Sequence, residues 1–292
     1  MIGKGIIIKG IGGFYDVMLD DDILRCTPRG KFRKDGIIPM VGDRVEVNTR
    51  DAVVENILPR KNQFNRPLVA NIDYLGIVVS VKKPQPDLLL VDKLILSAAV
   101  NSVKSMIIIN KIDLAESQTE IESIKEEYKI SGCTVFTISC KEGTGIDELM
   151  NELGRGITVF AGQSGVGKSS LINCLHPYQK QEVGDISKKA KRGRHTTRNV
   201  ELLVLPDGRM IVDTPGFSAM NVNSILPEEV QNYYNEFIPY IHECKFLGCL
   251  HNKEPDCAVK NAVQRGKLPV GRYERYIRIL EMLDQERWWQ RW

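Results

Sequence analysis

A run of glycines followed by lysine and serine is the first feature of this sequence that could perform chemistry. It fits the phosphate-loop pattern G-x-x-x-x-G-K-[ST], in which backbone N–H groups converge on phosphate oxygens. The run follows an apolar stretch and precedes a helical one, which is the context that the pattern requires. It predicts a nucleotide-binding loop that consists of Gly162, Gln163, Ser164, Gly165, Val166, Gly167, Lys168, Ser169 and Ser170.

Two side chains of this loop and one later motif predict how a triphosphate is held. We expect Lys168 to reach the β- and γ-phosphates and to act in catalysis, and Ser169 to place its hydroxyl on Mg²⁺. Downstream, Asp213-Thr-Pro-Gly216 fits the D-x-x-G element that senses the terminal phosphate in GTPases. Asp213 is expected to hold a Mg²⁺-bound water, and the N–H group of Gly216 to face the γ-phosphate.

A second set of motifs predicts which base is bound. Asn110, Lys111 and Asp113 form an N-K-x-D pattern after an apolar run. Asp113 can accept hydrogen bonds from N1–H and the 2-amino group of guanine, whereas adenine would leave its carboxylate unpaired. Backbone N–H groups near the guanine 6-oxo group are expected from a further strand end, Ser139, Cys140 and Lys141.

The order of these motifs along the chain is unusual. In an ordinary GTPase the base-reading motif follows the phosphate loop and the D-x-x-G element, but here Asn110–Asp113 precedes both. The sequence therefore predicts a circularly permuted GTPase domain that uses GTP, GDP and Mg²⁺. The chain that follows Asp213–Gly216 must lead into a different part of the molecule.

A polar stretch at residues 179–198 is where a switch loop should supply a threonine to Mg²⁺. Thr196 and Thr197 are candidates that spacing does not separate; Thr197 is the predicted catalytic Mg²⁺ ligand. Many GTPases orient the attacking water with a glutamine after D-x-x-G, but this chain has Phe217 there. His195 is the candidate for that role, and the alternative is a loop histidine without a catalytic part.

Three cysteines and a histidine near the C-terminal end predict a metal site. Their spacing is C-x4-C-x-H-x5-C, a set suited to one tetrahedral structural zinc. The ligands would be Cys244, Cys249, His251 and Cys257, with His242 as a spare candidate nearby. Isolated buried cysteines or a redox pair are the alternatives.

The elements that must position these residues fall into three predicted domains. Residues 1–65 contain short β-rich stretches punctuated by glycine, which predict a small closed barrel of OB or SH3-like type. Residues 66–222, after a linker at about 60–73, alternate apolar runs with helical stretches and predict a doubly wound α/β domain. Residues 223–292 are predicted to be a helical zinc-binding domain.

Charge identifies no partner by itself, because the net charge of the 292 residues is only +3. Local basic clusters are either RNA contacts or solvated surfaces. In the barrel they are expected on one loop or hairpin: Arg25, Arg29, Lys31, Arg33 and Lys34. Around the zinc loop they are Lys245, Lys253, Lys260, Arg265, Lys267, Arg272, Arg275 and Arg278. No apolar run is long enough for a membrane span and no secretory signal is evident, so a cytoplasmic protein is expected.

These motifs, in this order and with this zinc spacing, resemble one family over essentially the whole chain. It is the bacterial GTPase family dependent on the small ribosomal subunit, called RsgA, YjeQ or YloQ, whose switch loop is similar to Gly193-Arg-His-Thr-Thr197. The resemblance implies an OB-fold N-terminal domain, the zinc ligands named above and a catalytic role for His195. It also implies a GTPase that acts late in assembly of the 30S subunit and is stimulated by that subunit, with 16S rRNA as a partner. A monomer is expected.

Two other functions remain open on the sequence. One is a signalling or RNA-modifying GTPase without a role at the ribosome. The other is an RNA-binding module that holds guanine nucleotide without useful hydrolysis, which Phe217 makes physically possible.

Overall fold

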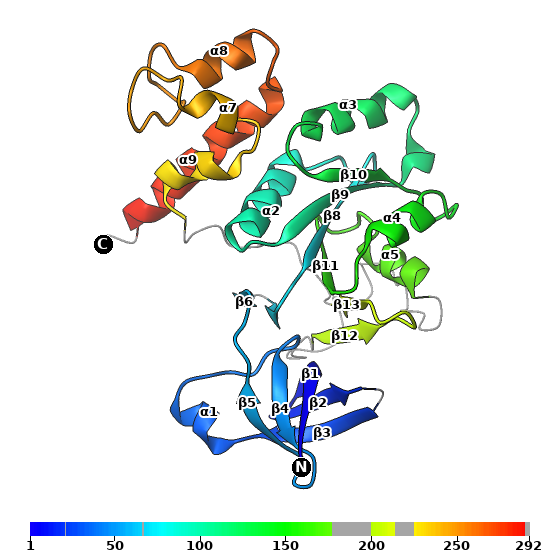
Figure 1. Cartoon of the computed structure of the whole chain (residues 1–292). Coiled ribbons are helices and arrows are strands. Elements are labelled where there is room, and N and C mark those ends of the chain that lie inside the picture. The colour runs from blue at the N-terminus through cyan, green and yellow to red at the C-terminus, as the bar shows by residue number, and fades with distance from the viewer. Residues whose placement is uncertain (21, 66, 177–199, 214–224, 290–292) are drawn as a thin grey trace.

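The computed structural model describes residues 1–20, 22–65, 67–176, 200–213 and 225–289 (Figure 1). Three folded parts follow one another along the chain: a β-barrel, an α/β domain and a helical domain. In Figure 1 the barrel and the helical domain lie at opposite ends of the α/β domain. The three-part fold class is as predicted, whereas the limits at residues 65 and 222 stay predictions.

The barrel is closed by pairing between its first and fourth strands. Its strand order is β1-β2-β3-β5-β4, and β4 pairs with β1 again. Only β3 and β5 run parallel, and a short helix, α1 (Gly30–Lys34), lies between β3 and β4. This five-stranded topology is of OB rather than SH3-like type. The strands are β1 (Ile2–Ile11), β2 (Phe14–Leu19), β3 (Asp22–Pro28), β4 (Arg44–Asn48) and β5 (Val53–Ile57).

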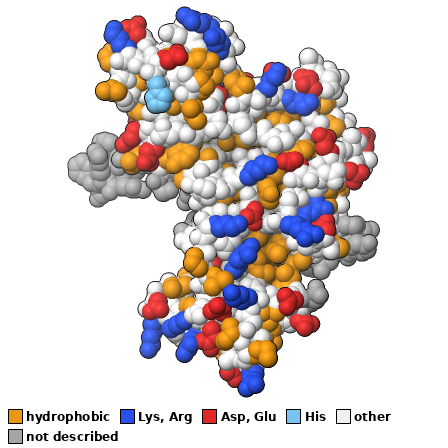
Figure 2. Space-filling model, in the orientation of Figure 1, with side chains coloured by type: hydrophobic (Ala, Val, Ile, Leu, Met, Phe, Trp, Pro, Cys, Tyr) orange, Lys and Arg blue, Asp and Glu red, His pale blue; other side chains and the backbone are white. Residues whose placement is uncertain are grey.

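The basic stretch of the barrel does not lie on one loop or hairpin, so that expectation is wrong. Arg25 is on β3, where its guanidinium lies 5.8 Å from the centre of the Phe14 ring. Most of the other basic residues belong to α1, which buries Phe32 in the barrel core and leaves its lysines and arginine exposed. Lys and Arg side chains gather at this end of the molecule in Figure 2.

The α/β domain is built on a mostly parallel sheet whose order reflects the permutation. Its strands run β10-β9-β8-β11-β13-β12, and only β12 is antiparallel to its neighbour. β8 therefore lies beside β11 although two other strands of the sheet come between them in the chain. The strands are β8 (Tyr74–Ser80), β9 (Lys104–Asn110), β10 (Thr134–Thr137), β11 (Ile157–Ala161), β12 (Glu201–Val204) and β13 (Met210–Asp213).

Helices cover both faces of this sheet because alternate strand residues point to opposite sides. On β9, Ile107 and Ile109 pack in the cluster that includes α2 and α3, while Met106 and Ile108 pack in the cluster of α4 and α5. The predicted doubly wound arrangement is confirmed. The helices are α2 (Leu88–Val100), α3 (Gln118–Tyr128), α4 (Ile146–Glu152) and α5 (Lys168–Leu175).

Two connections join the barrel to the α/β domain. β1 pairs with β12 at Lys9 and Glu201, whose side chains form an ion pair of 2.7 Å, so both domains share one eleven-stranded sheet. The predicted linker contains a two-stranded sheet, β6 (Gln63–Asn65) and β7 (Leu68–Ala70). Just before it, Arg60 binds the buried carboxylate of Asp43 with two hydrogen bonds of 2.7 and 2.8 Å.

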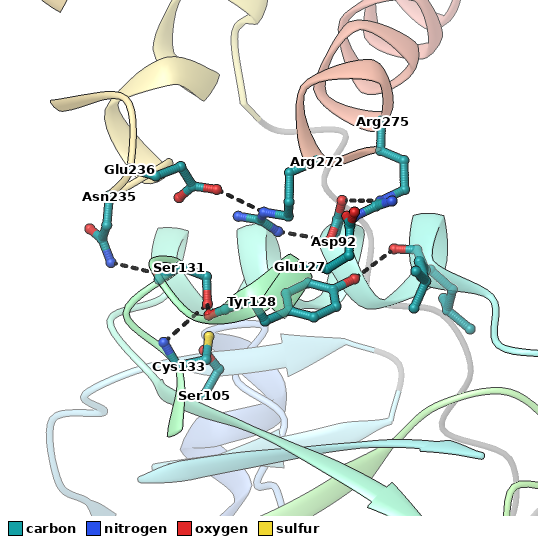
Figure 3. A network of polar contacts seen from close by, with 12 residues as sticks. Asp92, Ser105, Glu127, Tyr128, Ser131, Cys133, Asn235, Glu236, Arg272 and Arg275 are labelled. Atoms are coloured by element: carbon teal, nitrogen blue, oxygen red, sulfur yellow. Dashed lines mark hydrogen bonds and ion pairs between the residues drawn. The ribbon is translucent and has the colours of Figure 1, made fainter. Parts of the chain in front are cut away.

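The C-terminal domain contains a 3-10 helix, η2 (Pro227–Tyr233), and the helices α7 (Ile238–Ile241), α8 (Ala258–Gln264) and α9 (Val270–Trp289). It docks on α2 and α3 through a buried network of charges (Figure 3). Arg272 binds Asp92 of α2 and Glu236, both at 2.7 Å, and Arg275 binds Asp92 and Glu127.

This network corrects one expectation from the sequence. The sequence places Arg272 and Arg275 in a basic cluster that is either an RNA contact or a solvated surface, but their side chains are only 2% and 12% exposed. The Arg272 guanidinium lies between the rings of Tyr128 and Tyr234, at 5.3 and 4.7 Å from their centres. These two arginines therefore belong to the contact between domains, while Lys245, Lys253, Arg265, Lys267 and Arg278 remain exposed.

Candidate nucleotide site and metal centre

The predicted phosphate loop joins β11 to α5 and depends on glycines with positive φ. Gly162 has φ +142°, and a Cβ there would lie 2.1 Å from the carbonyl oxygen of Val78. Gly167 has φ +100°, and a Cβ there would lie 2.3 Å from Nδ2 of Asn110. Because both contacts are too close for any side chain, these two positions require glycine.

Lys168 occupies the first turn of α5 and points back at the loop. Its Nζ atom donates to the carbonyl oxygens of Gly162 and Gln163, at 2.7 and 2.8 Å. Burial lowers the pKa of Lys168 to about 8, because desolvation disfavours the ammonium form. Ser169 follows with an exposed hydroxyl. A cation and a hydroxyl thus lie at the N-terminus of α5, where the helix dipole also favours an anion.

Asn110 holds the predicted base-reading and phosphate motifs together. Its Nδ2 atom donates to the carbonyl oxygen of Val166 at 2.9 Å. Its Oδ1 atom accepts from the backbone N–H groups of Lys111 and Cys140, at 2.7 and 3.3 Å. Asn110 is 1% exposed, so one buried amide joins segments that are far apart in the sequence.

Lys111 adds a second connection to the phosphate loop. It has φ +61°, and its Nζ atom donates to the carbonyl oxygen of Gly165 at 2.7 Å and to that of Lys83. Burial lowers its pKa. The contact with Lys83 brings the loop after β8 to the site, and the sequence held no motif that could have revealed it.

Asp113 is positioned by the residues of the predicted Ser-Cys-Lys element. Ser139 Oγ donates to Asp113 Oδ1 at 2.7 Å, and Lys141 Nζ lies 3.9 Å from Oδ2. The Asp113 side chain is 6% exposed and therefore has little freedom to turn. Burial raises the pKa of the Cys140 thiol to about 12, so this thiol stays protonated and is no nucleophile.

The remaining predicted residues of this site fall in two groups. Asp213 ends β13, the strand beside β11, so it and the phosphate loop share the carboxyl edge of the sheet. The hydroxyl of Ser169 and the carboxylate of Asp213 are hard oxygen ligands of the kind that Mg²⁺ takes. Outside the described residues lie His195, Thr196, Thr197, Gly216 and Phe217. The individual roles of all these residues in nucleotide binding stay predictions.

The predicted zinc ligands converge on one point. The ligand atoms of Cys244, Cys249, His251 and Cys257 all lie within 4.8 Å of one another. Tetrahedral zinc with its usual bond lengths places two sulfurs about 3.8 Å apart, and a sulfur and a nitrogen about 3.5 Å apart. The sulfurs of Cys244 and Cys257 are 3.9 Å apart, and Nδ1 of His251 lies 3.5 and 3.3 Å from them. The residues fit the ion.

Burial affects the protonation of three of these ligands. Desolvation raises the pKa of the Cys249 and Cys257 thiols and lowers the pKa of His251. His251 is fully buried and packs edge-on against Phe237. His242, the spare candidate, is exposed and does not belong to the cluster.

Comparisons with known proteins cover nearly the whole chain. Residues 56–223 match the family model described as RsgA GTPase, and residues 4–53 match the RsgA N-terminal domain. The chain belongs to the RsgA GTPase family. Curated proteins named small ribosomal subunit biogenesis GTPase RsgA include one from Caldanaerobacter subterraneus, 44% identical over 97% of this chain and 96% of its own length. Another, from Ruminiclostridium cellulolyticum, is 43% identical over 96% of this chain and 93% of its own.

Solved structures of RsgA-family proteins have the same architecture. YjeQ from Thermotoga maritima is 35% identical, with a TM-score of 0.84, and the match covers 97% of this chain and 99% of that one. YloQ, described as a circularly permuted GTPase, is 33% identical with a TM-score of 0.80, and covers 98% of this chain and 96% of its own. This RsgA-family chain is accordingly a GTP hydrolase with permuted motifs. None of its described helices is long and apolar enough to cross a membrane.

Proposed function

We propose that this GTPase binds the small ribosomal subunit, acts late in its assembly and hydrolyses GTP in a manner stimulated by that subunit. The observation that carries the proposal is the match over nearly the full length of relatives named for small-subunit biogenesis. The cytoplasm is the compartment in which such a protein would work, and a monomer is the expected form.

The nucleotide would be read by the site described above. Asp113, oriented by Ser139, accepts from guanine, and Asn110 with Lys111 keeps the base-reading segment against the phosphate loop. Backbone N–H groups of the predicted loop hold the phosphates. Lys168 neutralises their charge, and Ser169 with Thr197 holds Mg²⁺.

The barrel and the C-terminal domain would supply the contacts with 16S rRNA. Arg29, Lys31, Arg33 and Lys34 lie exposed in and beside α1. Exposed cations of the zinc domain include Lys245, Lys253, Arg265 and Lys267. Such clusters attract phosphate backbones even where the net charge of the chain is small.

Coupling between nucleotide and RNA would follow from the permutation. The predicted phosphate sensor, Asp213–Gly216, is followed in sequence by the segment that leads to η2 and the zinc domain. β12, which pairs with the barrel strand β1, lies in sequence between the predicted switch stretch and the sensor. Equal affinity of the GTP-analogue and GDP forms for the 30S subunit would contradict this coupling.

The first experiment compares GTP turnover by the purified protein alone, with 30S subunits and with 50S subunits. We expect large stimulation by the 30S subunit only, because the activator must complete a site whose usual glutamine is replaced by Phe217. Equal and slow turnover in all three conditions would contradict the proposal. It would favour a nucleotide-regulated binding module.

His195 is the proposed water-orienting residue, and a matched pair of variants tests it. His195→Ala should reduce 30S-stimulated turnover by about 10²-fold or more while leaving GTP and 30S binding intact. His242→Ala is the control, since His242 is exposed and outside the metal cluster. Normal stimulated turnover by His195→Ala would show that another group orients the water.

A further inference from the structure

A glutamine of η2 contacts the histidine of the metal cluster at the ring nitrogen that faces away from the cysteines. Gln231 Oε1 lies 2.8 Å from Nε2 of His251, while Nδ1 of the same ring faces the sulfurs of Cys244 and Cys257. Both partners are buried, with Gln231 8% exposed and His251 fully buried. The two ring nitrogens therefore have different neighbours: Nε2 faces the glutamine, and Nδ1 faces the metal cluster.

The orientation of Gln231 determines which nitrogen carries the proton. Its Nε2 atom donates to the backbone carbonyl oxygen of Glu228 at 3.1 Å, so its Oε1 atom must be the one that faces His251. An amide oxygen only accepts hydrogen bonds, so His251 must present Nε2–H to it. Nδ1 then carries no proton, and its lone pair faces the sulfurs of Cys244 and Cys257.

We propose that Gln231 is a positioning residue of the metal centre, which fixes the tautomer and the plane of the His251 ring. The inference rests on the proposed zinc site and extends it to a residue outside the four ligands. Histidine ligands in proteins generally donate their second N–H to such a partner, and loss of that partner typically costs 10- to 100-fold in metal affinity.

The position of Gln231 in the chain gives this contact a consequence for η2. η2 is the first described element after the predicted phosphate sensor, and it packs in the C-terminal core through Val230. A metal ion bound to His251 would also stabilise η2, because Gln231 of η2 is hydrogen-bonded to His251. The order of η2 should therefore depend on the metal.

The test compares zinc affinity among four full-length proteins, by competition with a colorimetric zinc chelator. Gln231→Leu keeps the approximate size but removes the acceptor, and should bind zinc 10- to 100-fold more weakly than the parent. Gln231→Glu keeps an acceptor and should bind zinc at least as tightly as the parent. Gln264→Leu is the control, because Gln264 is exposed on α8 of the same domain. It should match the parent.

Two further measurements distinguish positioning from a general loss of structure. In Co²⁺-loaded protein, the visible absorption bands should shift in Gln231→Leu but not in Gln264→Leu. Amide exchange in zinc-loaded Gln231→Leu should be faster at residues 229–233 and unchanged in α8.

Unchanged zinc affinity and unchanged cobalt bands in Gln231→Leu would overturn the role of Gln231 and leave the zinc site intact. A parent protein that takes up no zinc would overturn both the proposed zinc site and the role of Gln231. These two failures are therefore distinguishable.

Discussion

At the scale of single residues, two lysines of the nucleotide site are bonded to backbone carbonyls. Lys168 contacts Gly162 and Gln163, and Lys111 contacts Gly165 and Lys83. An ammonium group is attracted more strongly to an anionic phosphate than to a neutral carbonyl oxygen, because opposite charges attract each other. A phosphate can therefore displace the carbonyl partners of Lys168. Lys111 lies on the base-reading segment, and we expect it to keep its partners and so to hold that segment against the phosphate loop.

The pKa of Lys168 predicts how nucleotide affinity depends on pH. Only the ammonium form attracts phosphate, and with a pKa of about 8 it is the main form at pH 7 and a minor form at pH 9. Affinity for a non-hydrolysable GTP analogue should therefore fall about tenfold between these pH values. Fluorescence titration measures the change. Lys168→Arg is the control, since its side chain stays charged, and an equal fall in both proteins would assign the effect to guanine ionisation.

Asp113 predicts the base preference. In Asp113→Asn the side-chain amide donates where the carboxylate accepted, so the site should favour xanthosine triphosphate over GTP. Loss of hydrogen bonds to a charged group should weaken GTP binding by about 100-fold. Competition between the two nucleotides measures the preference, with Asp147→Asn, an exposed position on α4, as control. If Asp113→Asn still preferred GTP to the same extent, Asp113 would not be the residue that recognises the base.

At the scale of elements, the motifs could be placed from the sequence because each lies where a buried strand ends. The apolar runs before Asn110, Ser139 and Gly162 became β9, β10 and β11, and α5 begins at Lys168. Such signals are local, and the alternation of strands and helices is enough to read them.

Elements that depend on partners far away in the sequence could not be predicted from local patterns. β12 has only four residues and owes its place to β13 and β1, and the β6–β7 pair arises from contacts within the linker. Gln231 could not be recognised as a partner of His251 either, because 20 residues separate them and a single glutamine carries no pattern.

The metal-binding loop and its helices should take up zinc with release of protons. Burial raises the pKa of Cys249 and Cys257, so both thiols carry protons at pH 7 in the metal-free protein and lose them to the ion. His251, with a lowered pKa, is already neutral and releases none. Zinc affinity should therefore rise with pH, and the protons of these two thiols should be among those released.

Calorimetry in buffers of different ionisation enthalpy counts these protons. The chain with Cys26→Ser, which removes a buried thiol of the barrel core, is the control and should release the same number. Zinc uptake without proton release would mean that the thiols are not the ligands.

At the scale of the whole molecule, the GTPase domain holds its two neighbours by different means. The barrel continues the sheet through β1 and β12, next to a partly exposed ion pair between Lys9 and Glu201 that contributes little stability. The C-terminal domain is fixed by buried charges, and Arg272 is bonded to Asp92 on one side and Glu236 on the other. The barrel also packs Ile8 and Val41 in the main apolar core of the GTPase domain, so both neighbours are held by buried contacts.

Arg272 should accordingly be the residue on which docking of the zinc domain depends. Arg272→Met leaves the buried carboxylates of Asp92 and Glu236 with one partner fewer, and removal of one member of a buried pair costs about 3–5 kcal/mol. Denaturant unfolding should show this loss, and small-angle scattering should show a less compact particle. Arg278→Met on the same helix is the control, because Arg278 is exposed.

The double variant Asp92→Asn with Arg272→Met separates docking from general damage. If the two side chains stabilise the contact as a pair, the double variant should lose less stability than the sum of the single variants. Additive losses, with scattering unchanged, would show that the domains are held by the apolar contacts of Leu96 and its neighbours rather than by the charges. GTP binding should survive in all three variants, since no residue of the nucleotide site belongs to this network.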